Sequence, residues 1–220
     1  MCGRFALFTP APKLAEIFQA ELHFNYDASY NLAPTLPIAV LITIGEERHI
    51  VPMRWGLIPT WHREGEKLSV LNNAKLETID TKPSFRHAFT RHRCLILADG
   101  FYEWDAHTQP KQPYYFHRSD HQPIALAGIW ERWTSGSTPI ESCCIITEPA
   151  NALVATVHTR MPAIITSSDY DQWLDPTIDD TKLAKSLAQS PNAYNGIDSY
   201  PVTPKMNRVV FNNVQCIQKI

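Results

Sequence analysis

Apolar positions near the start of the chain recur at helical spacing. They predict a helix over residues 12–22, with one face formed by Leu14, Ile17, Phe18 and Leu22. Downstream, β-branched and apolar runs predict strands, the first two joined by a turn at Gly45 and Glu46. The expected strands cover residues 38–44, 48–53, 93–98, 114–118, 124–130 and 143–147.

Shorter helices are expected in the last third of the chain. They cover residues 150–157, 168–174 and 181–189, and Ser167 or Ser168 is the predicted N-cap of the second. Strands dominate the middle of the chain without a regular βαβ alternation. We therefore predict an α+β fold, a single domain over residues 1–220, built on a mainly antiparallel, barrel-like β-sheet with short peripheral helices.

Charge and cysteine content narrow the function classes. The 220 residues hold 20 Lys and Arg against 22 Asp and Glu, a net charge of -2, which excludes a protein that coats duplex DNA by bulk charge but leaves room for a local basic groove. The odd number and irregular spacing of the cysteines favour reduced thiols over a disulfide framework, and no CxxC pair suggests zinc. Neither a metal nor a cofactor is implied, and the expected location is cytoplasmic, nucleoid-associated in a bacterium. The five cysteines are Cys2, Cys94, Cys143, Cys144 and Cys216.

Position 2 carries the most chemical information. Methionine aminopeptidases remove Met1 when the second side chain is small, so we expect Cys2 to become the first residue. An α-amine of pKa about 8 and a thiol of pKa about 8.5 would then share one residue. Such a 1,2-aminothiol condenses with aldehydes to a five-membered thiazolidine, and the linkage of the two nucleophiles favours ring closure.

Six short motifs reinforce the case for Cys2, and they span residues 2–162. The motifs are Met1-Cys2-Gly3-Arg4-Phe5, Tyr30-Asn31-Leu32-Ala33-Pro34, Trp55-Gly56-Leu57-Ile58-Pro59, Asn73-Ala74-Lys75-Leu76-Glu77-Thr78, Ala98-Asp99-Gly100-Phe101-Tyr102-Glu103-Trp104 and His158-Thr159-Arg160-Met161-Pro162. In this order they resemble the SRAP (SOS-response-associated peptidase) family, whose members crosslink to abasic sites.

The resemblance implies four active-site residues. Cys2 matches the nucleophile, and Asn73, Glu103 and His158 match the residues around it. A carboxylate and an imidazole suit the proton transfers of sugar-ring opening and imine formation, and an amide suits orientation by hydrogen bonds. Each also has a simpler interpretation: Glu103 as a solvent-facing strand residue, Asn73 as a turn former, His158 as one of nine ordinary histidines.

The expected partner is single-stranded DNA that contains abasic sites. Residues 82–93 hold four basic and no acidic residues, interleaved with Phe85 and Phe89, a pattern typical of single-strand binding, although a basic surface over core phenylalanines has the same pattern. Family-like phosphate contacts are Arg4, Lys75, Arg86 and Arg160, and the stacking candidates are Trp61 and Trp104.

Three departures from the family pattern bear on DNA affinity more than on chemistry. Lys75 stands where the family usually has Arg, so the charge remains but bidentate geometry is lost. Ser29 replaces an Arg before Tyr30, and Thr159 replaces a residue that is commonly acidic or amidic.

The resulting hypothesis is a monomeric DNA-repair protein that captures abasic sites through Cys2, with lyase and self-processing peptidase activity. One alternative is an N-terminal-nucleophile amidohydrolase or peptidase, since class II glutamine amidotransferases also begin Met-Cys-Gly. Another is a non-catalytic single-strand-binding module, in which Cys2 would be dispensable.

Overall fold

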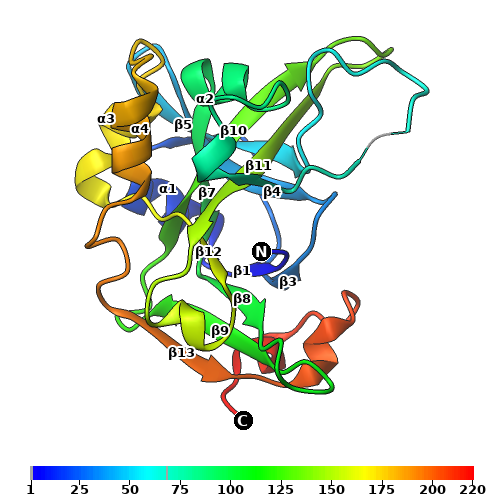
Figure 1. Ribbon diagram of the computed structural model, residues 1–220, viewed down its shortest axis with the longest axis vertical. Coiled ribbons are helices and arrows are strands. Elements are labelled where there is room, and N and C mark those ends of the chain that lie inside the picture. The colour runs from blue at the N-terminus through cyan, green and yellow to red at the C-terminus, as the bar shows by residue number, and fades with distance from the viewer. Residues whose placement is uncertain (1, 68) are drawn as a thin grey trace.

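Two β-sheets, built mostly from antiparallel pairs, organise residues 2–67 and 69–220, the part of the chain that the computed structural model describes (Figure 1). The strands are β1 (Phe5–Leu7), β2 (Glu21–Leu22), β3 (Ser29–Leu32), β4 (Pro37–Ile44), β5 (Glu47–Trp55), β6 (Asn73–Lys75), β7 (Arg93–Ala98), β8 (Gly100–Trp104), β9 (Pro113–Arg118), β10 (Ile124–Trp133), β11 (Ile140–Pro149), β12 (Arg160–Pro162) and β13 (Ile197–Pro201). The α-helices are α1 (Ala11–Phe18), α2 (Arg86–Arg91), α3 (Tyr170–Leu174) and α4 (Thr181–Ala188).

The larger sheet bends into a ring. Its strands follow the order β12-β11-β10-β7-β4-β5-β2, and β11 also pairs with β5. This last pairing is parallel and short, joining Ser142 to Arg54 and Cys143 to Trp55. The predicted α+β class and mainly antiparallel sheet are confirmed, while the barrel-like element is a ring of strands rather than a complete barrel.

The smaller sheet holds the N-terminal residues. Its order is β13-β9-β8-β1-β3, so β1 lies between β8 and β3. Phe5 pairs with Phe101 and Ala6 with Gly100, and Tyr102 N donates to Arg4 O at 3.0 Å. Antiparallel pairing in this register brings the residue after Tyr102 level with the first residues of the chain.

Buried apolar side chains of both sheets merge into one core. Phe5 of β1 packs against Trp55 of β5 with ring centroids 5.1 Å apart, and both side chains are fully buried. Phe101 stacks on Phe116 at 4.9 Å within the smaller sheet. This shared core fixes the position of β1 relative to the ring of strands.

No helix among the described residues has the length and apolar character needed to cross a membrane.

The first helix is shorter than its periodicity predicts. It ends at Phe18, because Gln19 adopts a left-handed conformation with φ 50° and its N–H closes the last turn. Glu21 and Leu22 then pair with β5 as the parallel strand β2. The prediction of a helix over residues 12–22 was thus wrong beyond residue 18, where strand pairing replaces helical hydrogen bonds.

Of the other predicted elements, the strands and the last helix are confirmed, while the two helices before it are shorter than predicted. All six strands exist, several of them longer, and α4 begins as expected, with Asp180 accepting from Lys182 N and Leu183 N. Residues 150–157 form only a short 3₁₀ helix, Val154–Thr156. Residues 168–174 divide into a 3₁₀ turn, Ser167–Asp169, and α3, so neither Ser167 nor Ser168 is the N-cap.

Candidate active site

Cys2 is enclosed at the junction of the two sheets. Its side chain is fully buried, and its Sγ approaches Arg4 O at 3.8 Å. Asn73, the first residue of β6, donates from Nδ2 to Cys2 O at 2.8 Å. Because β6 pairs in parallel with β11, with Asn73 opposite Ile145, the ring of strands holds the amide in place. Asn73 is therefore a strand residue that positions Cys2, and not a turn former.

The other atom of the Asn73 amide is an acceptor without a hydrogen bond to the described residues. Asn73 Oδ1 is also buried from solvent. Buried polar atoms are nearly always paired, and an exception in a native site usually has a functional reason. The oxygen is thus available to accept from an N–H group placed beside Cys2.

Glu103 lies in β8 and is buried, with 1% of its surface exposed. The interpretation of Glu103 as a solvent-facing strand residue is therefore wrong. Burial raises the pKa of the Glu103 carboxyl to about 7, because the charged form loses its hydration. At neutral pH this carboxyl is divided between its acid and its conjugate base, the condition that suits a general acid–base group.

His158 faces Glu103 from the turn before β12. Its Nδ1 lies 4.0 Å from Glu103 Oε2, and Arg160 N donates to the same Nδ1 at 3.0 Å. Arg160 O lies 3.1 Å from the same Nδ1, so both the N–H and the carbonyl of Arg160 hold this side of the ring in place. Burial lowers the pKa of His158, which favours the neutral imidazole.

The thiol of Cys2 is held in its protonated form. Burial raises its pKa, and the nearby carboxylate of Glu103 raises it further. Such a thiol is a poor nucleophile unless a neighbouring group takes its proton as it attacks. Glu103 is close enough to interact with the thiol and has the intermediate pKa that this transfer needs.

Two further residues near the Cys2 site were not predicted from the sequence. Tyr194 donates from its hydroxyl to Pro162 O at 2.5 Å, and burial raises its pKa, with the charges of Glu148, Cys2 and Glu103 adding to the effect. Glu148 of β11 is also buried, and its pKa rises to about 7. Neither stands in one of the six motifs, and no spacing in the sequence marks them.

Arg4 and Trp104 lie together beside the Cys2 site. The Arg4 guanidinium is 5.9 Å from the centre of the Trp104 ring, and Nη1 donates to Asn31 Oδ1 at 2.6 Å and to Met206 O at 3.1 Å. Trp104 Nε1 donates to Asn207 Oδ1 at 2.6 Å. Both predicted DNA contacts thus also bind the segment Pro204–Asn207 to the smaller sheet.

Arg160 and Lys75 differ in their freedom to meet a phosphate. Arg160 makes a bidentate ion pair with Glu77, at 2.5 and 2.9 Å, and donates to Thr147 O at 2.6 Å. Lys75 is exposed and follows Asn73 by two positions in β6, so both side chains lie on one face of the strand. The structure therefore leaves Lys75 accessible and engages Arg160 internally.

The phenylalanines of residues 82–93, expected to stack on DNA bases, do not lie on the surface of the protein. Phe85 and Phe89 are buried, 7% and 0% exposed, and belong to the core, so the alternative of a basic surface over core phenylalanines is correct. Arg93 is buried as well and donates to backbone carbonyls, among them Trp173 O at 2.7 Å. Arg86 remains exposed at the start of α2.

Arg86 and Trp61 lie outside the Cys2 cluster. Arg86 belongs to α2, which packs against β7 and β10 at the top of Figure 1, while β1 lies near the centre. Trp61 is 61% exposed in the segment between β5 and β6. The structure brings Cys2, Asn73, Glu103 and His158 together, and leaves these two on the surface.

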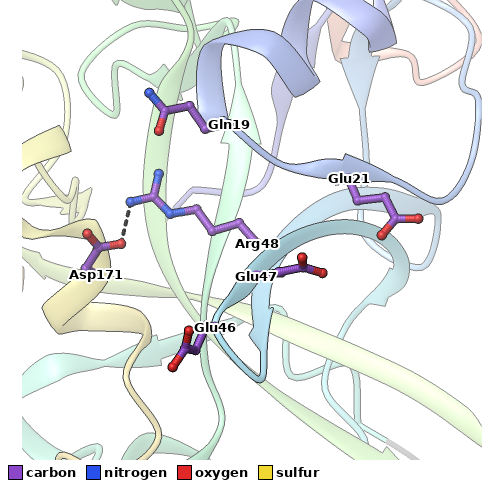
Figure 2. A pocket seen from close by; sticks show the side chains of 6 residues that line it. All are labelled: Gln19, Glu21, Glu46, Glu47, Arg48 and Asp171. Carbon is purple, nitrogen blue, oxygen red and sulfur yellow. Dashed lines mark hydrogen bonds and ion pairs between the residues drawn. The ribbon is translucent and has the colours of Figure 1, made fainter.

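A polar hollow of about 470 Å³ is lined by none of the four site residues. Figure 2 shows four acidic side chains around it, with Arg48 ion-paired to Asp171 at 2.5 Å. An acidic lining repels phosphate, so this hollow does not suit a DNA strand. Its lining residues are Gln19, Glu21, Glu46, Glu47, Arg48 and Asp171.

An enclosed cysteine near the N-terminus thus lies beside an amide and a carboxyl, with an imidazole next to the carboxyl. The chain belongs to the SRAP family, described as SOS response associated peptidase, whose profile matches residues 1–209. This family assignment confirms the resemblance in the six motifs.

Individual relatives match along nearly the whole chain. The abasic site processing protein YoqW of Bacillus subtilis is 34% identical over 223 residues, 99% of both chains. YedK of Escherichia coli, with the same description, is 28% identical over all of both chains. A crystal structure of a protein from Bacteroides thetaiotaomicron covers all of both chains with a TM-score of 0.86 and 26% identity.

Proposed function

We propose that this protein repairs DNA by processing abasic sites, and that it captures them in single strands as a thiazolidine on Cys2 after removal of Met1. The relatives named abasic site processing proteins support the substrate. One observation supports the chemistry above all: Asn73 holds Cys2 O at 2.8 Å beside a buried Glu103 carboxyl whose pKa is about 7.

The proposed reaction loses one water molecule overall. The Cys2 amine adds to the C1′ aldehyde of the opened sugar to give a carbinolamine, and protonation of its hydroxyl releases water and leaves an iminium. The Cys2 sulfur then bonds to the same carbon, and its proton passes to a base, while the nitrogen regains the electron pair of the C=N bond. Glu103 acts first as the acid and then as the base.

Asn73 and His158 orient the reactants in this scheme. Asn73 Oδ1, a buried acceptor, receives an N–H of the Cys2 amine and so directs the nitrogen lone pair toward the aldehyde. The neutral imidazole of His158 orients the sugar through a hydrogen bond at Nε2, since Arg160 already engages Nδ1. Exposed Lys75 and Arg86 supply charge for the phosphates of the strand, and exposed Trp61 supplies a stacking surface.

Two further activities belong to the same proposal. The iminium intermediate acidifies the neighbouring sugar carbon, so strand cleavage by β-elimination is the expected lyase side reaction. Peptidase activity, the activity in the family description, is proposed only for the bond after Met1. Burial of Cys2 argues against a site that accepts peptides broadly.

The test is incubation with a single-stranded oligonucleotide that carries one abasic site, followed by a denaturing gel. We expect a heat-stable adduct with the wild type and with Cys144→Ala, a control that removes another buried cysteine, and none with Cys2→Ala. Cys2→Ala should still bind the strand reversibly. A stable adduct of full yield with Cys2→Ala would overturn the thiazolidine, and absence of any wild-type adduct would favour the non-catalytic binding module.

A further inference from the structure

Two histidines converge on one buried carboxyl at the top of the molecule, apart from the Cys2 site. His87 lies in α2, His92 is the C-cap residue of that helix, and Glu131 lies in β10. Glu131 is 4% exposed. His87 Nδ1 lies 2.9 Å from Glu131 Oε1, and His92 Nδ1 lies 3.4 Å from Glu131 Oε2.

The second of these contacts does not satisfy its nitrogen. His92 Nδ1 is buried and makes no hydrogen bond with the described residues, although Glu131 Oε2 is near. The ring of His92 packs on Trp130 with centroids 4.8 Å apart, which holds its orientation. A buried nitrogen lone pair or N–H without a partner is costly, and a cation placed between the nitrogen and the carboxylate removes that cost.

Nearby arginines do not neutralise Glu131. Arg91 pairs with Asp179 at 3.5 Å, and Arg93 donates to the carbonyls of Phe89 and Trp173. The buried carboxylate therefore depends on two imidazoles for compensation.

We propose that His87, His92 and Glu131 form a binding site for a divalent transition-metal ion of the zinc type. Two imidazoles and a carboxylate are donors that Zn²⁺ prefers, and such sites leave one position to water. The ligand atoms lie within 4.8 Å of one another. Ligands about 2.0–2.2 Å from a tetrahedral zinc ion are roughly 3.3 Å apart, so small side-chain rotations complete the geometry.

A second cluster provides a natural comparison. Glu21, His23 and His49 also place their ligand atoms within 4.8 Å, but His23 Nε2 and His49 Nδ1 already share a hydrogen bond of 2.7 Å. The Glu21 side chain is 63% exposed there, so water solvates its charge. The difference between the two clusters is therefore His92 Nδ1, a buried nitrogen without a hydrogen bond to the described residues.

The site would fasten α2 to the larger sheet. Two ligands come from α2 and its C-cap and one from β10. A bound ion would add to the backbone hydrogen bond from Trp130 N to His92 O, 2.9 Å, and to the contact of His87 with Glu131. Metal binding to the folded state alone stabilises it in proportion to the logarithm of the metal concentration above the dissociation constant. The melting temperature should therefore rise with added Zn²⁺.

The experiment is a calorimetric titration of Zn²⁺ into tag-free protein freed of metal with EDTA, repeated with three variants. His87→Ala removes an exposed ligand and Glu131→Gln preserves shape, while His23→Ala disables the comparison cluster. We expect one equivalent to bind, with affinity at least about tenfold weaker in His87→Ala and Glu131→Gln and unchanged in His23→Ala. Co²⁺ should show visible absorption of low-symmetry coordination in the wild type and His23→Ala only.

Either of two results would overturn the site. One is wild-type Zn²⁺ affinity in His87→Ala, a variant at an exposed position that is expected to fold. The other is loss of binding in His23→Ala alone, which would move the metal to the comparison cluster. A circular dichroism spectrum of each variant confirms folding before titration, and Glu131→Gln that fails to fold leaves His87→Ala as the deciding variant.

Discussion

Glu103 Oε2 and His158 Nδ1 lie 4.0 Å apart, although the two residues come from β8 and from the turn before β12. Burial moves the two pKa values in opposite directions, up for the carboxyl and down for the imidazole. Near neutral pH the carboxyl is therefore divided between its acid and its conjugate base, while the imidazole is largely neutral. This arrangement suits the carboxyl to proton transfer and the imidazole to orientation of a reactant.

Replacement of Glu103 by Gln should slow crosslinking without weakening DNA binding. General acid–base assistance is worth about 10²–10⁴-fold, and Gln keeps the size of the side chain but transfers no proton. Single-turnover crosslinking rates at several pH values measure the effect, because long incubations hide a slow reaction. An initial rate within about threefold of the wild type between about pH 5 and 8 would contradict the role.

Stability should depend on pH through the same carboxyl. The folded pKa of about 7 lies above the ordinary value of 4.5, so the folded state holds the proton more tightly and the stabilisation is complete below pH 4.5. It is lost as pH rises through 7, a loss of about 3 kcal/mol for this shift. Relative to wild type, Glu103→Gln should gain melting temperature steadily from pH 4.5 to 8. Glu141→Gln, at an exposed position, controls for the loss of one charge, and a pH-independent difference contradicts the burial argument.

On the DNA-binding surface, Arg86→Glu should weaken single-strand binding and reduce its salt dependence. Each phosphate contact to a single strand contributes a slope of about −0.7 to the logarithm of affinity against the logarithm of salt. Fluorescence anisotropy across a salt titration measures both quantities. Arg132→Glu, an equal charge change at an exposed position of β10, is the matched control. If Arg86→Glu and Arg132→Glu behave alike, Arg86 does not contact the strand.

The variant Glu77→Gln tests whether Arg160 contacts a DNA phosphate or only stabilises the fold. In Glu77→Gln the bidentate ion pair is lost, while Arg160 keeps its bond to Thr147 O. If Arg160 serves the DNA, single-strand affinity should rise severalfold, because the guanidinium no longer has a competing carboxylate. Unchanged affinity together with a lower melting temperature would assign Arg160 to the fold alone.

The residues around Cys2 could be named in advance because each stands in a short motif. Their meeting could not be deduced, since it depends on pairing of β1 with β8 and of β6 with β11, strands far apart in the chain. The burial of Glu103 follows from the same strand pairing, so the sequence alone could not predict whether this side chain is buried or exposed. Tyr194 shows the limit most clearly, because it reaches the site from a segment without any motif.

Other errors share this origin. Phe85 and Phe89 are interleaved with basic residues, as side chains that stack on DNA bases often are. Both are nevertheless buried in the core, because a helix that lies on a sheet must bury its apolar face. The helical periodicity of residues 12–22 continues past Phe18, but β5 offers Glu21 and Leu22 a strand partner. The cluster of His87, His92 and Glu131 has no spacing signature at all, because α2 and β10 meet only in the fold.

The anchoring of Arg4 to Met206 O sets an order of events during synthesis. The two residues are 202 positions apart, so at roughly 5–20 residues per second the ribosome needs about 10–40 s between them. Throughout that interval the contact between Arg4 and Met206 O cannot form, and the wall beside Cys2 is incomplete. Under the proposed function, translation gives removal of Met1 a time window that ends when the last segment folds against Arg4.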